Sequence, residues 1–300
     1  MITKGKFDFG FGTNYARSAV IGDLKWTADE TNKCCSMFAE ERCTVLRCEP
    51  VNTSRTLLWT CLARGSFRST NKDKSRQATF HRWNHRFDGR HKEVHVHQRK
   101  SARFASQTAV KSAGGIAFGL IHVEIVESSI VDLSKPHNLL IEESSDAAKL
   151  KIDGEEIWVS KNDLGCRSPF FRNLFTGDFK EKAEDSYELK DLKIDEFTHF
   201  LALLSDMRIS IDKNSVEYLL KLGDLFLCKT VLHQCEEFLQ NVGKKDIPLA
   251  EKFRLANRYK LNKLLMDVVD KIPLEDLKSI PHEDFSRFAS DLIMQKMNTY

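Results

Sequence analysis

The sequence predicts an α+β protein in two parts: a β-rich first part, then a small sheet covered by short helices and followed by a helical tail. Two observations predict this division. Residues 1–140 hold short alternating apolar runs and carry 22 Lys+Arg against 13 Asp+Glu. From about residue 146, apolar residues recur at helical spacing, and residues 141–300 carry 24 Lys+Arg against 30 Asp+Glu. We therefore expect a linker within 134–146, SKPHNLLIEESSD, where Pro136 precedes a polar run.

Residues 1–140 are predicted to form an antiparallel β-sandwich. Apolar and polar residues alternate in 43–48 and in 121–125. The stretch LLWTCLARGSFR (57–68) holds an alternating run that is interrupted at Gly65 and resumes as a second strand. Short strands that recur every 10–20 residues or so favour a two-sheet β architecture.

The second part is predicted to begin with a hairpin. Leu150 and Ile152 alternate with charged residues, and Asp153-Gly154 favours a tight turn before extended residues 156–159. A third short strand is predicted at 187–190, where Tyr and Leu alternate with charged residues. These three strands would form a small sheet.

Helix caps and helical periodicity predict the remaining elements. Ser160, with Asp163 three residues on, resembles a capping box, and Ser168-Pro169 begins a second short helix that Gly177 ends. Asp195 is predicted to cap the next helix. Further helices are predicted at 215–228, 231–239, 249–261 and 264–272, with another pair in 274–297 and Pro281 before its second member.

The stretch SKNDLGCRSPFFRNLFTGDFKE (160–181) is rich in aromatic side chains. Phe171, Leu174 and Phe175 recur at helical spacing, which predicts that they pack in the core. Phe170 points elsewhere, so it serves either the core or a dimer interface.

The same stretch resembles the signature of the BTB (POZ) domain. That family usually has a His-Lys pair, a Leu three residues on, then Ser-x-x-Phe and a closing Phe. Here Ser160-Lys161, Leu164, Ser168, Phe171 and Phe175 stand at those positions, so Ser160 replaces the histidine.

The resemblance continues on both sides of this signature. LKIDGEEIWVS resembles the opening hairpin of the family, YELKDLKIDEFTHFLALL its third strand and following helix, and YLLKLGDLFLCKTVLHQCEEFL its late helix pair. The frequent Tyr-Thr-Gly after the middle helix is absent, because the chain reads Ser205-Asp206-Met207 there. The resemblance implies a BTB domain over 146–242, and the pair at 249–272 resembles a BACK-like or three-box tail within 246–300.

A BTB resemblance implies specific partners. BTB domains form homodimers, and the family pairs through the region that here holds Leu150, Ile152, Leu164 and Phe170. Many BTB domains also bind a cullin scaffold, and adaptors of the cullin-3 class carry a hydrophobic-x-Glu motif after the Ser-x-x-Phe helix. Phe179 and Glu181 stand at that position, so we expect them to contact a cullin-3-type scaffold.

The first part also resembles a known family. The run Trp59-Thr60-Cys61-Leu62-Ala63, with Phe67 after it, is similar to the early strands of a degenerate MATH (TRAF-like) sandwich. MATH domains often precede BTB domains in adaptors that bring substrates to a ubiquitin ligase. The resemblance therefore implies that residues 1–140 bind a protein client, whose identity it does not give.

Two groups of metal-ligating residues occur in the first part. Five histidines (His81, His85, His91, His95 and His97) fall within seventeen residues. HRWNHRFDGRHKEVHVH nevertheless fits two strands around an Asp88-Gly89 turn better than a helix, and its basic side chains repel a cation. Cysteines 34, 35, 43 and 48 lack a C-x-x-C repeat, so we expect no metal and no cofactor.

Residues 62–103 are strongly basic, with twelve Lys+Arg against three acidic residues. Phe80, Trp83 and Phe87 are interleaved with them, which is typical of a surface that binds phosphate groups. Nucleic-acid binding is therefore one hypothesis. We favour a solvated basic face, or a patch for acidic substrate segments, because no zinc-finger array or helix-turn-helix is recognisable.

The sequence thus predicts a non-catalytic interaction protein. It contains no Gly-rich phosphate loop, nucleophile elbow or HExxH motif, which argues against an enzyme. The expected function is a substrate adaptor of a cullin-3-type ubiquitin ligase; the alternative is a BTB scaffold or transcriptional-regulator oligomerisation protein without cullin binding. No secretory signal or membrane span is recognised, and the eight cysteines are interpreted as reduced thiols, which predicts a cytoplasmic or nuclear location.

Overall fold

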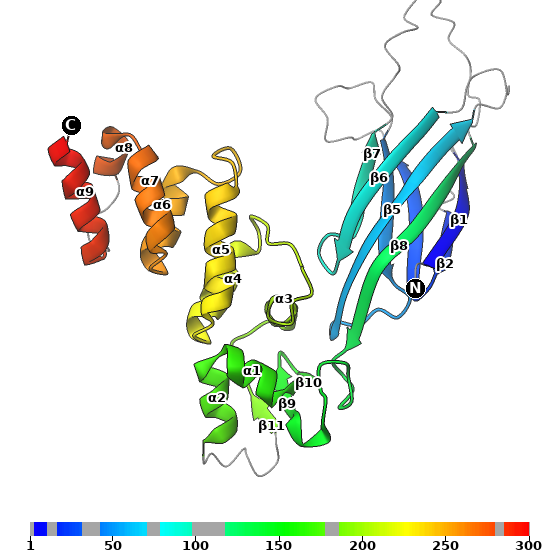
Figure 1. Ribbon diagram of the computed structural model, residues 1–300, viewed down its shortest axis with the longest axis horizontal. Coiled ribbons are helices and arrows are strands. Elements are labelled where there is room, and N and C mark those ends of the chain that lie inside the picture. The colour runs from blue at the N-terminus through cyan, green and yellow to red at the C-terminus, as the bar shows by residue number, and fades with distance from the viewer. Residues whose placement is uncertain are drawn as a thin grey trace, which may run out of the picture. The chain divides into compact units, whose positions relative to one another are not determined.

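The computed structural model describes residues 3–10, 17–31, 43–70, 79–97, 118–177, 186–279 and 285–299. The chain forms two compact units, residues 1–131 and 132–300. The predicted α+β class is confirmed, because antiparallel sheets make up the first unit and a small sheet with helices makes up the second (Figure 1). Among the described residues, no helix is both long and apolar enough to cross a membrane.

Two four-stranded sheets build the first unit. Their pairings β1–β8, β5–β6, β2–β3, β3–β4 and β4–β7 are antiparallel. One sheet has the order β1 (Thr3–Gly10), β8 (Phe118–Asp132), β5 (Leu57–Thr70), β6 (Thr79–Asp88). The other has the order β2 (Arg17–Ile21), β3 (Leu24–Thr31), β4 (Cys43–Pro50), β7 (Glu93–His97).

Alternate residues of both sheets meet in one core, which makes the unit a sandwich. Trp26 of β3 is fully buried, and its ring centroid lies 5.2 Å from Phe87 and 6.1 Å from Trp83, both on β6. Cys48 and Cys61 are also buried there, and burial raises the pKa of the Cys48 thiol well above its usual range. Burial therefore keeps this thiol protonated.

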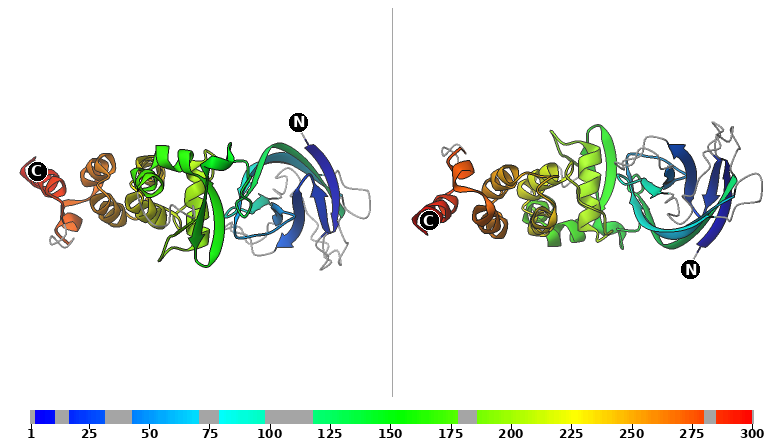
Figure 2. Two further views of the ribbon diagram at one scale, coloured as in Figure 1. Left: turned by 90° about the horizontal axis from the view of Figure 1, so that it is seen from below. Right: turned by 90° about the horizontal axis from the view of Figure 1, so that it is seen from above.

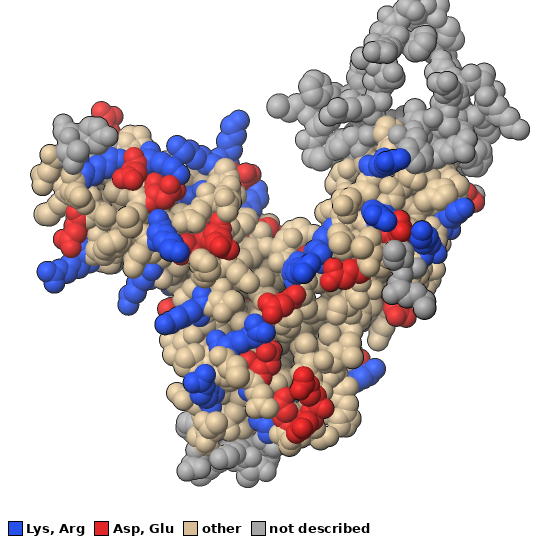
Figure 3. Space-filling model, viewed as in Figure 1, with Lys and Arg blue, Asp and Glu red and all other residues tan. Residues whose placement is uncertain are grey.

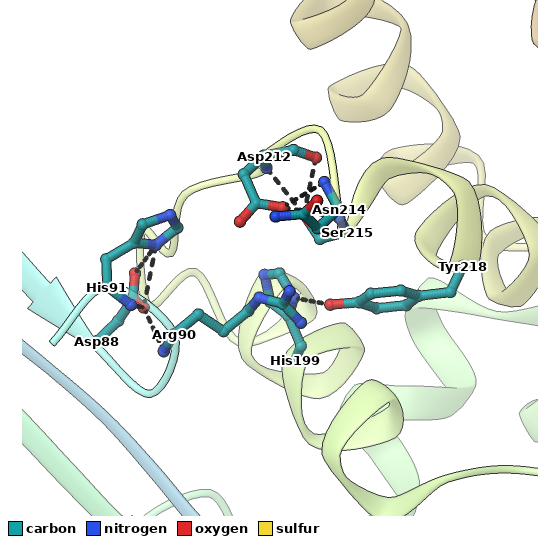
Figure 4. A network of polar contacts seen from close by, with 8 residues as sticks. All are labelled: Asp88, Arg90, His91, His199, Asp212, Asn214, Ser215 and Tyr218. Atoms are coloured by element: carbon teal, nitrogen blue, oxygen red, sulfur yellow. Dashed lines mark hydrogen bonds and ion pairs between the residues drawn. The ribbon is translucent and has the colours of Figure 1, made fainter. Parts of the chain in front are cut away.

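The predicted Asp88-Gly89 turn is present between β6 and β7, but these two strands belong to different sheets. The buried Asp88 carboxylate accepts the backbone N–H groups of Arg90 and His91, both at 2.8 Å, and lies 3.3 Å from the His91 ring (Figure 4). Burial raises the pKa of Asp88, but the hydrogen bonds from His91 and Arg90 outweigh it and lower the pKa. The turn thus moves the chain from one layer of the sandwich to the other.

The second unit begins with the predicted three-stranded sheet, of order β10 (Glu155–Ser160), β9 (Ala147–Ile152), β11 (Ser186–Glu188). A short 3₁₀ turn, η2 (Ser144–Asp146), precedes it. β9 and β10 form the antiparallel hairpin, and β11 pairs with β9 in parallel. Asp153 and Gly154 have φ values of 53° and 79°, so the turn has the positive φ that Asp-Gly favours.

Helices cover this sheet and continue beyond it in chain order (Figures 1 and 2). The helix expected to start at Asp195 begins instead at Ile194, with Lys193 as its N-cap. Asp195 lies in the first turn, where a carboxylate also interacts favourably with the helix dipole. The helices are α1 (Lys161–Arg167), α2 (Pro169–Thr176), α3 (Ile194–Leu204), α4 (Val216–Leu225), α5 (Lys229–Asn241), α6 (Leu249–Arg258), α7 (Asn262–Lys271), α8 (Leu274–Ser279) and α9 (Arg287–Thr299); Pro281 lies outside the described residues.

One polar contact joins α3 to α4, and two others order the loop before α4 (Figure 4). His199 of α3 and Tyr218 of α4 share a hydrogen bond of 2.5 Å. The Asp212 carboxylate accepts the backbone N–H groups of Asn214 and Ser215, at 2.9 and 2.7 Å. This loop therefore satisfies backbone donors at the beginning of α4.

Charged side chains join the tail helices α6, α7 and α9 to one another or to α5. Glu236 of α5 accepts the backbone N–H of Leu264 near the start of α7, at 3.1 Å. Lys252 of α6, only 4% exposed, donates to the carbonyl of Val242 after α5, at 2.6 Å. Lys296 of α9 donates to the carbonyls of Val269, Asp270 and Ile272 at the end of α7, at 2.6, 2.9 and 2.6 Å. The helix dipole favours each contact, because the Glu236 carboxylate lies at the start of a helix and the Lys252 and Lys296 amines lie at helix ends.

Replacing Gly65 should destabilise the first unit. A Cβ atom at Gly65 would lie 2.0 Å from the carbonyl oxygen of His122 and 2.6 Å from the Trp83 ring. We expect Gly65→Ala to lower the free energy of unfolding by about 1–3 kcal/mol through overpacking. Urea unfolding followed by tryptophan fluorescence measures this. Gly89→Ala is the control, because its Cβ would only meet Trp59 Nε1 at 3.8 Å; equal midpoints for both variants would contradict the packing argument.

Removing the Lys296 amine should loosen the tail. Lys296→Met leaves three carbonyl groups at the end of α7 without their charged donor, so we expect a loss of about 1–3 kcal/mol. Thermal unfolding followed by far-UV circular dichroism measures the change. Lys263→Met, at an exposed position of α7, removes the same charge and should leave the transition unchanged; a similar shift in both variants would exclude a specific role for Lys296.

Candidate protein-interaction surfaces

A buried polar cluster sets the start of α1. The Asp146 carboxylate accepts the Ser160 hydroxyl at 2.5 Å and the Asn162 backbone N–H at 2.7 Å. Ser160 Oγ in turn accepts the backbone N–H of Asp163 at 2.9 Å, which confirms Ser160 as the N-cap. The Asp163 carboxylate pairs with Arg167 at 2.9 Å. Ser160 therefore joins the hairpin to α1.

Ser168 performs a similar task for α2. Its oxygen accepts the backbone N–H of Phe171 at 3.2 Å, so the predicted N-cap is confirmed. Its hydroxyl donates to the carbonyl of Phe226, just after α4, at 2.5 Å. A single buried side chain therefore caps one helix and fixes its position against another.

The aromatic side chains of α2 form the centre of the core. Phe171 is fully buried, with ring centroids 4.8 Å from Phe226, 5.9 Å from Phe175 and 6.3 Å from Phe197. The predicted core positions of Phe171 and Phe175 are confirmed, whereas Leu174 is only half-buried. Most of the aromatic surface that the sequence concentrates in α2 is thus used inside the chain.

The four predicted dimer residues divide into two groups. Leu150, Ile152 and Leu164 are 0%, 1% and 3% exposed, so one chain already buries them. Phe170 is half-buried, with its ring 5.1 Å from Phe226, and keeps part of its surface outside. A role for these residues at a dimer interface stays a prediction.

An exposed apolar residue that the sequence analysis did not single out precedes the hairpin. Leu139 is 79% exposed, although the segment around it is firmly held. Buried Asn138 donates to the carbonyls of Lys135 and Trp158, both at 3.0 Å, and accepts the Leu140 backbone N–H at 3.0 Å. These bonds attach the segment to β10 and keep Leu139 in solvent. A periodicity search misses such a residue, because the segment is neither helix nor strand.

The predicted cullin contacts, Phe179 and Glu181, lie outside the described residues. They belong to 178–185, between the end of α2 and β11. Their role therefore stays a prediction, and the described part of the chain fixes only the two elements on either side of them.

The described residues of the histidine-rich segment lie apart from one another or contact other groups. Among the described residues, no group of three or more His, Cys, Asp and Glu side chains could hold a metal ion. Burial lowers the pKa of His81 and of His85, which favours neutral rings, and His91 contacts Asp88. The side chain of His97 lies outside this description.

In the basic segment, strand alternation places basic and aromatic side chains on opposite faces of β6. On β6, Trp83 and Phe87 point into the core and are 7% and 0% exposed, whereas Arg82 is exposed on the other face. The side chain of Phe80 is not described. The aromatic residues that suggested a nucleic-acid surface are therefore core residues where the structure shows them.

Comparisons with known proteins agree with this architecture. The BTB/POZ domain family matches residues 141–242. BTB and MATH domain-containing protein 38 of Caenorhabditis elegans is 34% identical over 143 residues, which cover 47% of this chain and 36% of that protein. Kelch-like protein 26 of Danio rerio is 27% identical over 135 residues, covering 45% and 22%.

Two further proteins are similar to part of this chain. BTB and MATH domain-containing protein 15 of Caenorhabditis elegans is 28% identical over 123 residues, covering 41% of this chain and 44% of that protein. The solved BTB domain of human gigaxonin is 26% identical, with a TM-score of 0.26, and covers 30% of this chain and 75% of that one. The matches thus span less than half the length of each of these three curated relatives.

The residues that match the family are also those that form the first part of the second unit. The hairpin, the Ser160 and Ser168 caps and helices α1–α5 all fall within 141–242. The chain therefore carries a BTB/POZ domain at residues 141–242, and its likeness to BTB and MATH domain-containing proteins is consistent with the MATH–BTB type.

Proposed function

We propose that the chain is a non-catalytic substrate adaptor of a cullin-3-type ubiquitin ligase. The BTB domain pairs with a second copy and docks on the scaffold, and the first unit holds the client. The observation that carries this proposal is the BTB/POZ match at 141–242 in a chain that also contains a separate two-sheet unit. The names of the relatives, which pair BTB with MATH domains, support the same combination.

The first unit acts as the MATH-like module in this proposal. Its eight described strands form two antiparallel sheets around one core, as a TRAF-like sandwich would require. Three domains follow from this assignment: residues 1–140 for the client, 146–242 for dimerisation and docking, and 246–300 as a BACK-like tail.

The adaptor works by proximity. It binds a client and the scaffold at once, so the client's lysines are held near the ubiquitin-charged enzyme at a high effective concentration. Pairing of two BTB domains adds a second client site and therefore avidity. A closed two-fold dimer uses the same surface from each copy. No chemistry is required of the adaptor's own side chains.

We expect the purified chain to be a homodimer that depends on the surface around Leu139. Leu139→Asp places a charge on a 79% exposed apolar residue, so it should weaken pairing without disturbing the core. Light scattering coupled to size-exclusion chromatography measures the mass. Leu225→Asp is the matched control, since Leu225 is 48% exposed at the end of α4. A wild-type monomer, or equal loss in both variants, would contradict this interface.

Cullin binding should depend on the segment after α2. Calorimetry of the full chain with a cullin-3 N-terminal domain should give micromolar or tighter affinity and one scaffold per chain. Phe179→Ala should cost roughly 1–3 kcal/mol as the loss of an apolar anchor, and Glu181→Ala should also weaken binding.

The control for this experiment is Phe288→Ala, which truncates a partly exposed phenylalanine on α9. It should bind like the wild type. A folded dimer that does not bind the cullin would favour the alternative, a BTB scaffold or transcriptional-regulator oligomerisation protein.

A further inference from the structure

The outer face of the sheet β1-β8-β5-β6 contains a basic groove. Its volume is about 800 Å³, and its polar lining comes from all four strands: Lys4 and Lys6 of β1, His122 and Glu124 of β8, Arg64 of β5 and Arg82 of β6. Figures 1 and 3 look onto this sheet, and Figure 3 shows Lys and Arg side chains over it, with Asp and Glu side chains among them. These residues alternate along their strands with core residues, so the sheet fixes their direction.

The charged side chains that line the groove are mainly positive. Among the lining residues that the structure describes, four Lys and Arg side chains face one carboxylate, that of Glu124. Arg64 donates to both oxygens of Glu124, at 3.0 and 3.2 Å, and Lys4 lies 3.3 Å from it. The hydrogen bond from Arg64 holds the pKa of Glu124 below its usual range. The negative charge is thus already shared by two cations, and the exposed side chain of Lys6 adds further positive charge beside them.

The register of the sheet spaces the cations. Lys6 lies opposite His122 across β1 and β8, and Arg82 lies opposite Ser66 across β6 and β5. Strands lie about 4.8 Å apart, so cations on β1 and β6 are separated by roughly 14 Å. An extended peptide advances about 3.3 Å per residue, so acidic side chains two to four residues apart can meet successive cations.

The burial of the aromatic residues favours a peptide over a nucleic acid as the ligand of this groove. Proteins that bind single-stranded nucleic acid offer exposed aromatic rings on which bases stack. Phe67, Trp83 and Phe87 are 1%, 7% and 0% exposed, so none of them offers a ring face to a base. The groove provides charge and hydrogen-bonding groups such as Ser66 and Asn84. This chemistry suits carboxylates or phosphates on a peptide.

We propose that this groove binds an extended, acidic peptide segment, which makes clients with Asp/Glu-rich or phosphorylated segments the class that the first unit recognises. The inference rests on the proposed adaptor function for its biological meaning, but the binding itself can be measured separately. It also gives a role to the basic segment 62–103, whose Arg64 and Arg82 belong to the groove.

The test uses the full chain and a fluorescein-labelled decapeptide in which glutamate alternates with serine, measured by fluorescence anisotropy. The peptide with glutamine in place of glutamate should not bind. Lys6→Glu and Arg82→Glu should each weaken binding roughly tenfold or more, as expected for the loss of one charge-assisted contact and the gain of repulsion. Added salt should weaken binding as well.

Lys25→Glu is the matched control, because Lys25 is exposed on β3 of the opposite sheet and the charge change is the same. It should bind the glutamate peptide like the wild type. Equal binding of the glutamine peptide, or equal loss in all three variants, would overturn the proposal. Tighter binding of an oligothymidine that Arg82→Glu abolishes would also overturn it, in favour of a nucleic-acid surface.

Cullin binding by the same variants separates the two proposals. Lys6→Glu and Arg82→Glu should retain the wild-type affinity for the scaffold. Peptide binding without cullin binding would remove the adaptor and keep the acidic-peptide site. Cullin binding without peptide binding would keep the adaptor and remove this groove as its client site.

Discussion

The hydroxyl of Ser168 joins the start of α2 to the end of α4, and the packing of the aromatic core of the BTB domain depends on that contact. The hydroxyl reaches the carbonyl of Phe226 because the chain reverses there: Leu227 has a φ of 56°, and the Cys228 N–H bonds back to the Gly223 carbonyl at 2.7 Å. This is a helix ending in which glycine is usual, so leucine costs roughly 1 kcal/mol of backbone strain. The Ser168 bond and the ring contact between Phe226 and Phe171 offset that cost.

How far the sequence predicts this fold depends on the range of each interaction. The Ser160 and Ser168 caps and the Asp153-Gly154 turn follow from neighbouring residues, and all three are present. Asp146 could not be predicted as the partner of Ser160, because fourteen residues and a hairpin separate them. Asp195 shows a different limit. An acid in the first turn and an acid at the N-cap both satisfy the helix dipole, so the pattern fixes the helix but not its first residue.

The candidate surfaces follow the same rule. Composition alone suggests that the basic and aromatic residues of 62–103 share one surface. Strand alternation instead places Arg64 and Arg82 on the outer face of the sheet and Trp83 and Phe87 in the core. Likewise, the turn at Asp88 could be predicted, but the separation of β6 and β7 into different sheets could not, because each strand pairs with a distant part of the chain. Leu139 was missed since its exposure depends on the bonds of Asn138 to Lys135 and Trp158.

The tail shows why long-range polar contacts matter for an interaction protein. Glu236 connects α5 to the start of α7, Lys252 connects α6 to the end of α5, and Lys296 connects α9 to the end of α7. Each contact satisfies a backbone group that a helix end would otherwise leave to water. The contacts therefore help to fix where each helix begins and ends relative to its neighbour. The proposed adaptor function would use this property, because helices that keep their positions present a docking surface with a constant geometry.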